Sequence, residues 1–406
     1  MSDQDLADQI TAIVRAEHGR LVATLIRRLG DIDLAEDAVS EALLTAWERW
    51  PRDGLPANPA AWLTRTAGNK AIDRIRREGK RQTKHHEAAM ITDDSPAPDE
   101  GPVTDDRLRL VFTCCHPALA PENRVALTLR LLGGLTVAEI AAAFLVPETT
   151  MAQRITRSKQ KIKAANIPYR VPGRLDLPAR LGTVCTVLYL IFNEGYLATT
   201  GTGLRADLCA EAIRLARQLA PLIEDPEVDG LLALMLLTDA RREARVVDGV
   251  LVTLDAQDRT RWDSALIDEG HALVRRCLRT NRPGPFQLQA AINAVHTDAL
   301  EASLTDWAQI VQLYDQLRLI QPGPVVELNR AVAVAELDGP EVALALVEPL
   351  RLEGYHPFWV TRAELLRRLG RVAEARSAYQ RALGLTGNEA ERAHLEGRLA
   401  TLGAGS

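Results

Sequence analysis

The sequence contains no run of about 18 uncharged apolar residues, so it offers no segment that could cross a membrane as a helix. Residues 2–5 are polar and include two aspartates, which argues against a secretory signal peptide at this end. Aromatic residues are few, at 4%, whereas the apolar and charged fractions, 47% and 25%, are ordinary for a soluble globular protein. We therefore expect a cytoplasmic protein whose 406 residues form roughly two to four domains.

Cysteine is also scarce, and its spacing excludes two familiar roles. The five cysteines are an odd, scattered set without a CxxC pair, so neither a disulfide framework nor a zinc knuckle is expected. Cys114 and Cys115 are adjacent and precede His116, but neighbouring side chains chelate a metal poorly and cysteine is commonly buried. We expect these two residues to pack in the core, and we expect no metal and no cofactor.

Strand-like alternation is missing as well, whereas apolar residues recur at the spacing of a helix. Steps of three and four run through residues 34–47 and again through residues 63–75. The fold class predicted for the whole chain is therefore all-α.

The charge distribution says more than the net charge of −5. Residues 70–84 are strongly basic, and residues 87–106 then carry seven acidic residues, three prolines and no basic residue. A segment of that composition buries too little apolar surface to fold alone, which predicts a flexible acidic linker at residues 85–106.

A helix-turn-helix is predicted after the linker. Thr136 and Glu139 form a capping box that starts a short helix, which should end near Phe144, and a second helix should begin at about Glu148. No acidic residue occurs from Met151 to Lys163, and the basic residues of the second helix suit contacts with DNA phosphates. A solvated basic helix without a partner is the simpler alternative.

These motifs resemble two regions of sigma factors, in the same order along the chain. Residues 135–141 and 150–157 (LTVAEIA and TMAQRITR) are similar to region 4, which recognises the −35 promoter element. Residues 31–42 resemble the region 2 helix that docks on RNA polymerase, and residues 61–77 resemble the helix that faces the −10 element. With no region 3 visible, the resemblance is to the extracytoplasmic-function (ECF) class.

The resemblance implies three sets of site residues. For the −10 element they are Asn69, Lys70, Arg74, Arg76 and Arg77, which lie outside the apolar stripe of their helix. For the −35 element they are Thr136, Thr149, Thr150, Gln153, Arg154, Arg157 and Lys161. For core RNA polymerase, through the clamp of the largest subunit, they are Asp33, Glu36, Asp37, Glu41 and Leu44. The resemblance also implies contact with the beta flap. Trp62 is expected in the core, whereas Trp47 and Trp50 could stack on bases.

The remaining residues resemble the tail of a C-terminally extended sigma class, in which a tetratricopeptide-like (TPR-like) domain regulates the sigma factor. Gly370, Ala375, Tyr379 and Ala382 have offsets typical of such a helix pair. Asn193, Glu194 and Tyr196 are a possible ligand or docking site, and a protein or intramolecular partner is the alternative to a small ligand. Polar groups satisfied between helices explain the acidic and histidine residues near 268–271 better than a metal site does.

The predicted organisation is a region 2 at residues 1–84, the linker at 85–106, a region 4 at 107–168, a helical extension at 169–290 and TPR-like repeats at 291–406. We expect a non-enzymatic sigma factor that binds core RNA polymerase and promoter DNA, and no membrane. The main alternative is a one-component helix-turn-helix regulator with a helical sensor, which would leave the region 2 resemblance unexplained. An enzyme in the C-terminal half, or a pure scaffold, has less support, because no activated nucleophile or metal set is evident.

Overall fold

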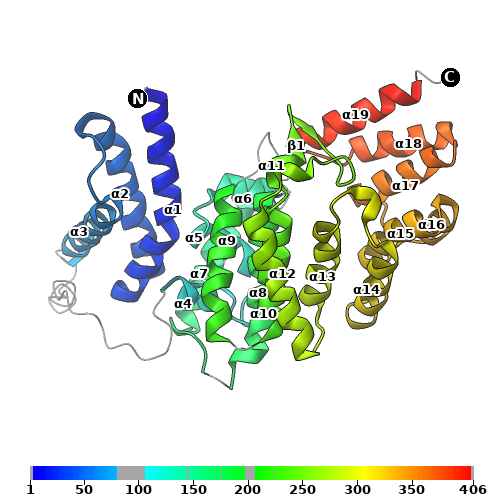
Figure 1. The fold of residues 1–406 in the computed structure, drawn as a ribbon. Helices are drawn as coiled ribbons and strands as arrows, with labels where there is room; N and C mark the ends of the chain where they lie inside the picture. The colour runs from blue at the N-terminus through cyan, green and yellow to red at the C-terminus, as the bar shows by residue number, and fades with distance from the viewer. Residues whose placement is uncertain are drawn as a thin grey trace. The chain divides into compact units, whose positions relative to one another are not determined.

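A computed structural model of the chain describes residues 3–79, 106–143, 146–173, 175–196, 206–223 and 225–403 (Figure 1). The all-α prediction is confirmed, because nearly all the regular structure in these ranges is helical. The predicted linker, residues 85–106, lies outside the described residues except for Asp106, and Phe144 also lies outside them.

Contacts between residues divide the chain into two compact units. The first contains α1 to α8 as far as Phe192 together with α9 as far as Leu215, and the second contains the helices that follow. The predicted domains are consecutive segments of the sequence, whereas each of these units combines separate segments. The predicted domain boundaries therefore stay predictions.

The first three helices, α1 (Asp3–Leu29), α2 (Ile32–Asp53) and α3 (Pro59–Gly79), pack on one another. Asp31 starts α2, because its side chain accepts hydrogen bonds from the backbone N–H groups of Asp33 and Leu34, at 2.9 and 3.0 Å. Trp50 is 2% exposed and meets the half-buried Trp62 edge-on, whereas Trp47 is 40% exposed. Of these three tryptophans, Trp47 is the one left on the surface.

The next four helices are α4 (Asp106–Cys114), α5 (Pro121–Leu131), α6 (Val137–Ala143) and α7 (Glu148–Ala164). The predicted capping box is confirmed: Thr136 N–H donates to Glu139 at 2.7 Å, and Glu139 N–H donates back to Thr136 Oγ1 at 3.1 Å. Met151, Ile155, Ser158 and Ile162 form the buried face of α7. The short helix, the turn and the second helix confirm the predicted helix-turn-helix.

The next two helices are α8 (Leu177–Tyr196) and α9 (Ala206–Leu219). Most of each belongs to the first unit, and the last residues of each belong to the second. The second unit continues with α10 (Pro226–Asp239), α11 (Arg242–Arg245), α12 (Ser264–Thr280) and α13 (Pro285–Asp298). Its last helices are α14 (Trp307–Ile320), α15 (Pro324–Leu337), α16 (Pro340–Val347), α17 (His356–Arg368), α18 (Val372–Leu383) and α19 (Glu389–Gly403). Short 3-10 turns occupy Ala220–Leu222, Arg259–Arg261 and Ala302–Leu304.

Helices α13 to α18 each pack on the next along the chain, as TPR-like hairpins do (Figure 1). Gly370 ends the turn after α17 with a φ of 73°, a conformation that favours glycine. Ala375, Tyr379 and Ala382 are buried on α18, and the Tyr379 hydroxyl donates to Glu364 of α17 at 2.8 Å. The small and aromatic residues of the sequence pattern therefore lie where the two helices meet.

The sequence analysis missed one element, the antiparallel hairpin of β1 (Val246–Val247) and β2 (Val250–Leu251). Asp248 and Gly249 connect its strands with φ values of 51° and 78°. Positive φ at both central residues is the geometry of a type I′ turn, for which Asp-Gly is a favoured dipeptide. Each strand has only two residues, too few to produce a visible alternation.

Candidate nucleic-acid interface

Helix α7 has two polar faces, of which one is exposed and the other forms ion pairs with α2. Thr149, Gln153, Arg157 and Lys161 follow one another at intervals of four residues and are exposed, so they line one side of the helix. Thr150 and Arg154 are half-buried beside them, and Thr136 is exposed at the start of α6. The seven predicted −35 residues thus lie on the helix-turn-helix, outside the buried face of α7.

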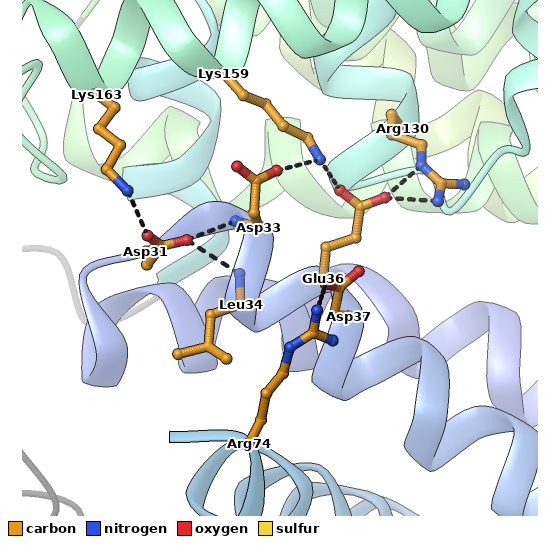
Figure 2. Close-up of polar contacts among 9 residues, drawn as sticks. All are labelled: Asp31, Asp33, Leu34, Glu36, Asp37, Arg74, Arg130, Lys159 and Lys163. Atoms are coloured by element: carbon orange, nitrogen blue, oxygen red, sulfur yellow. Dashed lines mark hydrogen bonds and ion pairs between the residues drawn. The ribbon is translucent and has the colours of Figure 1, made fainter. Parts of the chain in front are cut away.

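The other polar side of α7 is bound to α2. Lys159 Nζ lies 2.9 Å from Asp33 Oδ1 and 2.6 Å from Glu36 Oε2, and Lys163 Nζ lies 3.0 Å from Asp31 Oδ2 (Figure 2). Arg130 of α5 binds the other oxygen of Glu36 at 2.6 Å. We call these six residues the interregion cluster: Asp31, Asp33, Glu36, Arg130, Lys159 and Lys163.

The core of the cluster is shielded from water. The side chains of Glu36 and Lys159 are only 8% and 13% exposed, whereas that of Lys163 is 78% exposed. Burial acts to raise the pKa of Glu36, but Lys159 and Arg130 outweigh it and hold the pKa below its ordinary value. Burial acts to lower the pKa of Lys159, but Glu36 and Asp33 raise it overall. Both partners therefore stay charged at neutral pH.

A buried histidine lies beside this cluster. Burial and the charge of Arg130 lower the pKa of His18 to about 4, although Glu36 acts in the opposite direction. His18 is 7% exposed, and a Cβ added at Gly134 would meet its ring at 3.1 Å. Gly19, the next residue along α1, lies against Leu132, where an added Cβ would come within 2.5 Å of the backbone oxygen. Helix α1 therefore approaches the end of α5 closely because residue 19 has no side chain.

The predicted −10 residues divide into two groups on α3. Asn69, Arg76 and Arg77 are exposed. Arg74 instead lies 2.8 Å from Asp37 and 3.8 Å from Glu41, and Lys70 lies 3.8 Å from Glu41. Two of the predicted polymerase-binding carboxylates therefore contact cations of the neighbouring helix, as Figure 2 shows for Asp37 and Arg74.

The five predicted polymerase-binding residues do not share one environment. Leu44 is 63% exposed. Asp33 and Glu36 belong to the interregion cluster, and Asp37 and Glu41 face α3. All five lie on α2. Each of the four carboxylates has a cationic partner within the chain, whereas Leu44 is an exposed apolar side chain.

In the second unit, the possible ligand site is largely occupied by protein groups. Tyr196 is 6% exposed, and the Arg245 guanidinium lies 4.6 Å above its ring. Asn193 and Glu194 are half-buried. Glu269 pairs with both ends of the Arg217 guanidinium at 2.9 and 2.5 Å, and His271 Nε2 lies 2.8 Å from Thr297 Oγ1. Among the described residues, no group of three or more His, Cys, Asp or Glu side chains could hold a metal ion.

All five cysteines are buried, as expected for Cys114 and Cys115. Burial raises the pKa of both thiols, that of Cys115 to about 12, so neither forms a thiolate at neutral pH. Across the described ranges, no helix combines the length and the apolar character needed to span a membrane.

Comparison with known proteins agrees with this geometry. Sigma-70 region 2 matches residues 13–81, sigma-70 region 4 matches residues 109–162, and a family of unknown function (DUF6596) matches residues 180–278. The ECF RNA polymerase sigma factor SigL of Mycobacterium tuberculosis is 32% identical over 149 residues, which cover 36% of this chain and 83% of the relative. The chain belongs to the ECF sigma factors of the sigma-70 family.

Two further relatives define the extent of the likeness. The probable ECF RNA polymerase sigma factor SigI of Mycobacterium tuberculosis is 28% identical over 165 residues, 39% of this chain and 56% of the relative. An uncharacterized protein of Rhizobium meliloti is 45% identical over 394 residues, 94% of this chain and 93% of the relative. The likeness of this sigma factor to the Rhizobium protein therefore includes the C-terminal extension. No solved structure matches the chain.

The matched regions contain the candidate sites of this sigma factor. The region 2 match includes the −10 and polymerase sets, and the region 4 match includes the −35 set. Sigma-70 regions bind core RNA polymerase and promoter DNA, and they have no catalytic role in the family. Sequence reasoning missed the interregion cluster, because nothing in the spacing of Arg130 or Lys159 indicates that they meet Glu36, 94 and 123 positions away in the chain.

Proposed function

We propose that this sigma factor directs core RNA polymerase to promoters by recognising a −35 element through α7 and a −10 element through α3, and that its C-terminal helices modulate this activity. The observation that carries the proposal is the exposed side of α7, where Thr149, Gln153, Arg157 and Lys161 are aligned. Gln and Arg side chains can make paired hydrogen bonds to base edges in the major groove, and Arg and Lys can hold phosphates.

The exposed part of α3 supports contact with the −10 element. Asn69 offers an amide that can both donate and accept, and Arg76 and Arg77 can bind the backbone of a melted strand. Trp47 at the end of α2, being 40% exposed, is available for stacking on an unpaired base, whereas the buried Trp50 is not. These groups favour an opened promoter by binding it, and the polymerase supplies the chemistry.

Leu44 supports docking of α2 on the clamp of the polymerase. An exposed leucine gains most when a partner removes it from water, and a few such anchors often dominate the energy of an interface. The acidic residues around it would add charge complementarity. Contact of region 4 with the beta flap remains part of the proposal on family grounds.

The second unit offers surfaces through which a partner could modulate the sigma factor. A pocket of about 480 Å³ is lined by residues of the loop that follows α16 and by residues of α17 and α18, including Trp359, Arg362 and Arg381. The guanidinium groups of these arginines lie 6.0 and 5.4 Å from the Trp359 ring. Stacked helical repeats commonly bind proteins through such surfaces, which favours a protein or intramolecular partner over a small ligand at Tyr196.

Transcription with purified components tests the proposal. The full chain would be added to core RNA polymerase lacking any sigma factor, on a template carrying the upstream region of its own gene. A discrete transcript, with protection of DNA around positions −10 and −35, is the expected result. Binding to the same duplex without polymerase, and no transcript with it, would instead support a one-component regulator. A parallel reaction with residues 1–168 alone would show whether the extension raises or lowers transcript yield.

A further inference from the structure

A group of three arginines lies in the second unit. Arg241 precedes the short helix α11, Arg245 ends it, and Arg259 begins the 3-10 turn before α12. Among the described residues, none of the three forms an ion pair with an aspartate or a glutamate, although Arg217 and Arg276 of the same unit each do. The group is therefore a local excess of positive charge in a chain whose net charge is −5.

Two of the arginines bind the same side of α13. Arg241 Nη2 donates to Asn293 Oδ1 at 2.7 Å. Arg259 Nη1 donates to the backbone oxygen of His296, also at 2.7 Å. Asn293 and His296 are three positions apart on the helix and are therefore neighbours on its surface. Arg245 follows Arg241 by four positions across the single turn of α11, which places both on one side of that turn.

Arg241 is the buried member of the group. It is 8% exposed, and its Nε atom is buried without a hydrogen-bond partner in the described part of the chain. Burial lowers the pKa of Arg241, and the charges of Arg245 and Arg259 lower it further, whereas Tyr196 acts in the opposite direction. A buried cation with an unpaired donor and two like charges beside it is costly unless an anion offsets them.

Aromatic rings hold the other two guanidinium groups. The guanidinium carbon of Arg245 lies 4.6 Å from the centre of the Tyr196 ring, and that of Arg259 lies 4.4 Å from the centre of the Trp262 ring. A guanidinium that packs on a ring keeps the N–H donors in its own plane available to a ligand. Both arginines are half-buried, so solvent reaches the group through them.

The neighbouring histidine adds no charge to the group. Burial and the charges of Arg241 and Arg259 lower the pKa of His296 to about 4. His296 is therefore neutral at neutral pH, and the positive charge is that of the three arginines.

We propose that Arg241, Arg245 and Arg259 bind a doubly charged tetrahedral oxyanion, which is either inorganic phosphate or the phosphate group of a small metabolite. The planar guanidinium matches phosphate oxygens with pairs of N–H donors, and three such cations suit a dianion better than the single charge of a carboxylate. The ligand contacts the guanidinium groups and not the ring of Tyr196, against which Arg245 packs. The site belongs to the second unit alone, so it goes beyond the proposed promoter recognition and does not depend on it.

Calorimetric titration of the full-length chain tests the proposal, with inorganic phosphate, glycerol phosphate and acetate as probes at constant ionic strength. Arg245→Gln removes one guanidinium of the group, and Arg279→Gln removes the same charge from an exposed position on α12. We expect the wild-type chain and Arg279→Gln to bind phosphate with a dissociation constant below about 1 mM. Arg245→Gln should bind it at least about tenfold more weakly, and acetate should not bind measurably.

The three probes also distinguish the two sources of the anion. Tighter binding of glycerol phosphate than of inorganic phosphate would assign the site to a metabolite, and the absence of such a gain would assign it to free phosphate. The proposal would be overturned by a wild-type chain that binds no phosphate, by equal affinities of the wild-type chain and Arg245→Gln, or by acetate binding as tightly as phosphate.

Thermal unfolding provides a second measurement on the buried member. Arg241→Met replaces the buried charge with an apolar side chain. At a phosphate concentration of about 10 mM, the melting temperature of the wild-type chain and of Arg279→Gln should rise by at least about 2 °C, whereas that of Arg241→Met should stay unchanged. An equal rise in Arg241→Met would show that its guanidinium does not bind the anion and would contradict the proposal. Should Arg241→Met fail to fold, the titration of Arg245→Gln decides.

Discussion

The Nζ of Lys159 lies 2.6 Å from Oε2 of Glu36, so an ion pair connects the second helix of the helix-turn-helix, α7, to α2 of region 2. Basic residues that lie close together in the sequence of α7 point to different sides of the helix. On α7, Lys159 and Lys163 turn toward α2, whereas Arg157 and Lys161 are exposed. This division means that loss of DNA binding and loss of the intramolecular contact can be separated by substitution.

Arg157→Ala should weaken promoter use while leaving affinity for core polymerase unchanged. An arginine that contacts a base or phosphate contributes about 1–3 kcal/mol, so transcript yield at limiting promoter should fall roughly 5- to 150-fold. Arg279→Ala, an exposed arginine on α12, is the control. Equal transcription from both variants would show that this side of α7 does not contact the promoter.

Leu44→Glu should weaken binding to core polymerase about tenfold or more, because a charge would be placed at the proposed docking contact. The melting temperature should hardly change, since Leu44 is 63% exposed and packs on little. Leu278→Glu on α12 is a matched control, with an exposed fraction of 66%. The affinity is measured by titrating labelled sigma factor with core enzyme, and an undiminished affinity for Leu44→Glu would remove α2 from the polymerase interface.

Acid should destabilise the packing around His18 and the interregion cluster. The folded chain lowers the pKa of His18 from 6.5 to about 4, so the open or unfolded state takes up the proton more readily. Stability gained from a neutral His18 is therefore complete above about pH 6.5 and is lost progressively as pH falls toward 4. The groups around it are Arg130 and Glu36, and the lowered pKa of Glu36 acts in the same direction at still lower pH.

His18→Leu should remove the part of this pH dependence that lies between pH 6.5 and 4.5. The melting temperature, followed over that range, provides the measurement. The full shift corresponds to roughly 3 kcal/mol at about 1.4 kcal/mol per pKa unit. If the wild-type chain and His18→Leu respond to pH identically, His18 is not the group responsible.

Gly230→Ala should destabilise the second unit. An added Cβ on α10 would lie 2.6 Å from the backbone nitrogen of Gln287 in α13, so the two helices would have to separate. Overpacking of this kind costs about 1–3 kcal/mol. Gly397→Ala on α19 meets nothing within 4 Å and should instead gain up to about 1 kcal/mol from helix propensity. Denaturant unfolding compares the two variants, and equal stabilities would show that α10 and α13 do not pack as closely as described.

Periodicity and capping were sufficient to predict the helices around both candidate surfaces. The capping box of Thr136 and Glu139 located the start of α6 within one residue, because it is a local pattern. The fate of Trp47 and Trp50 could not be predicted, since their separation of three residues places both near one side of α2 and only tertiary packing distinguishes them. The pairing of Glu36 with Lys159 could not be predicted either, because it depends on how two helices that are distant in the sequence pack together. The Asp248–Gly249 turn, in contrast, carried a recognisable local signal that strand length obscured.

The most direct measurement is transcription by core RNA polymerase supplied with the purified full-length chain, on a template carrying its own upstream region. A transcript with a defined start, abolished or strongly reduced by Arg157→Ala and retained by Arg279→Ala, is the result we predict. A polymerase that produces no defined transcript with the wild-type chain, although the chain binds the same duplex unaided, would contradict the proposed function.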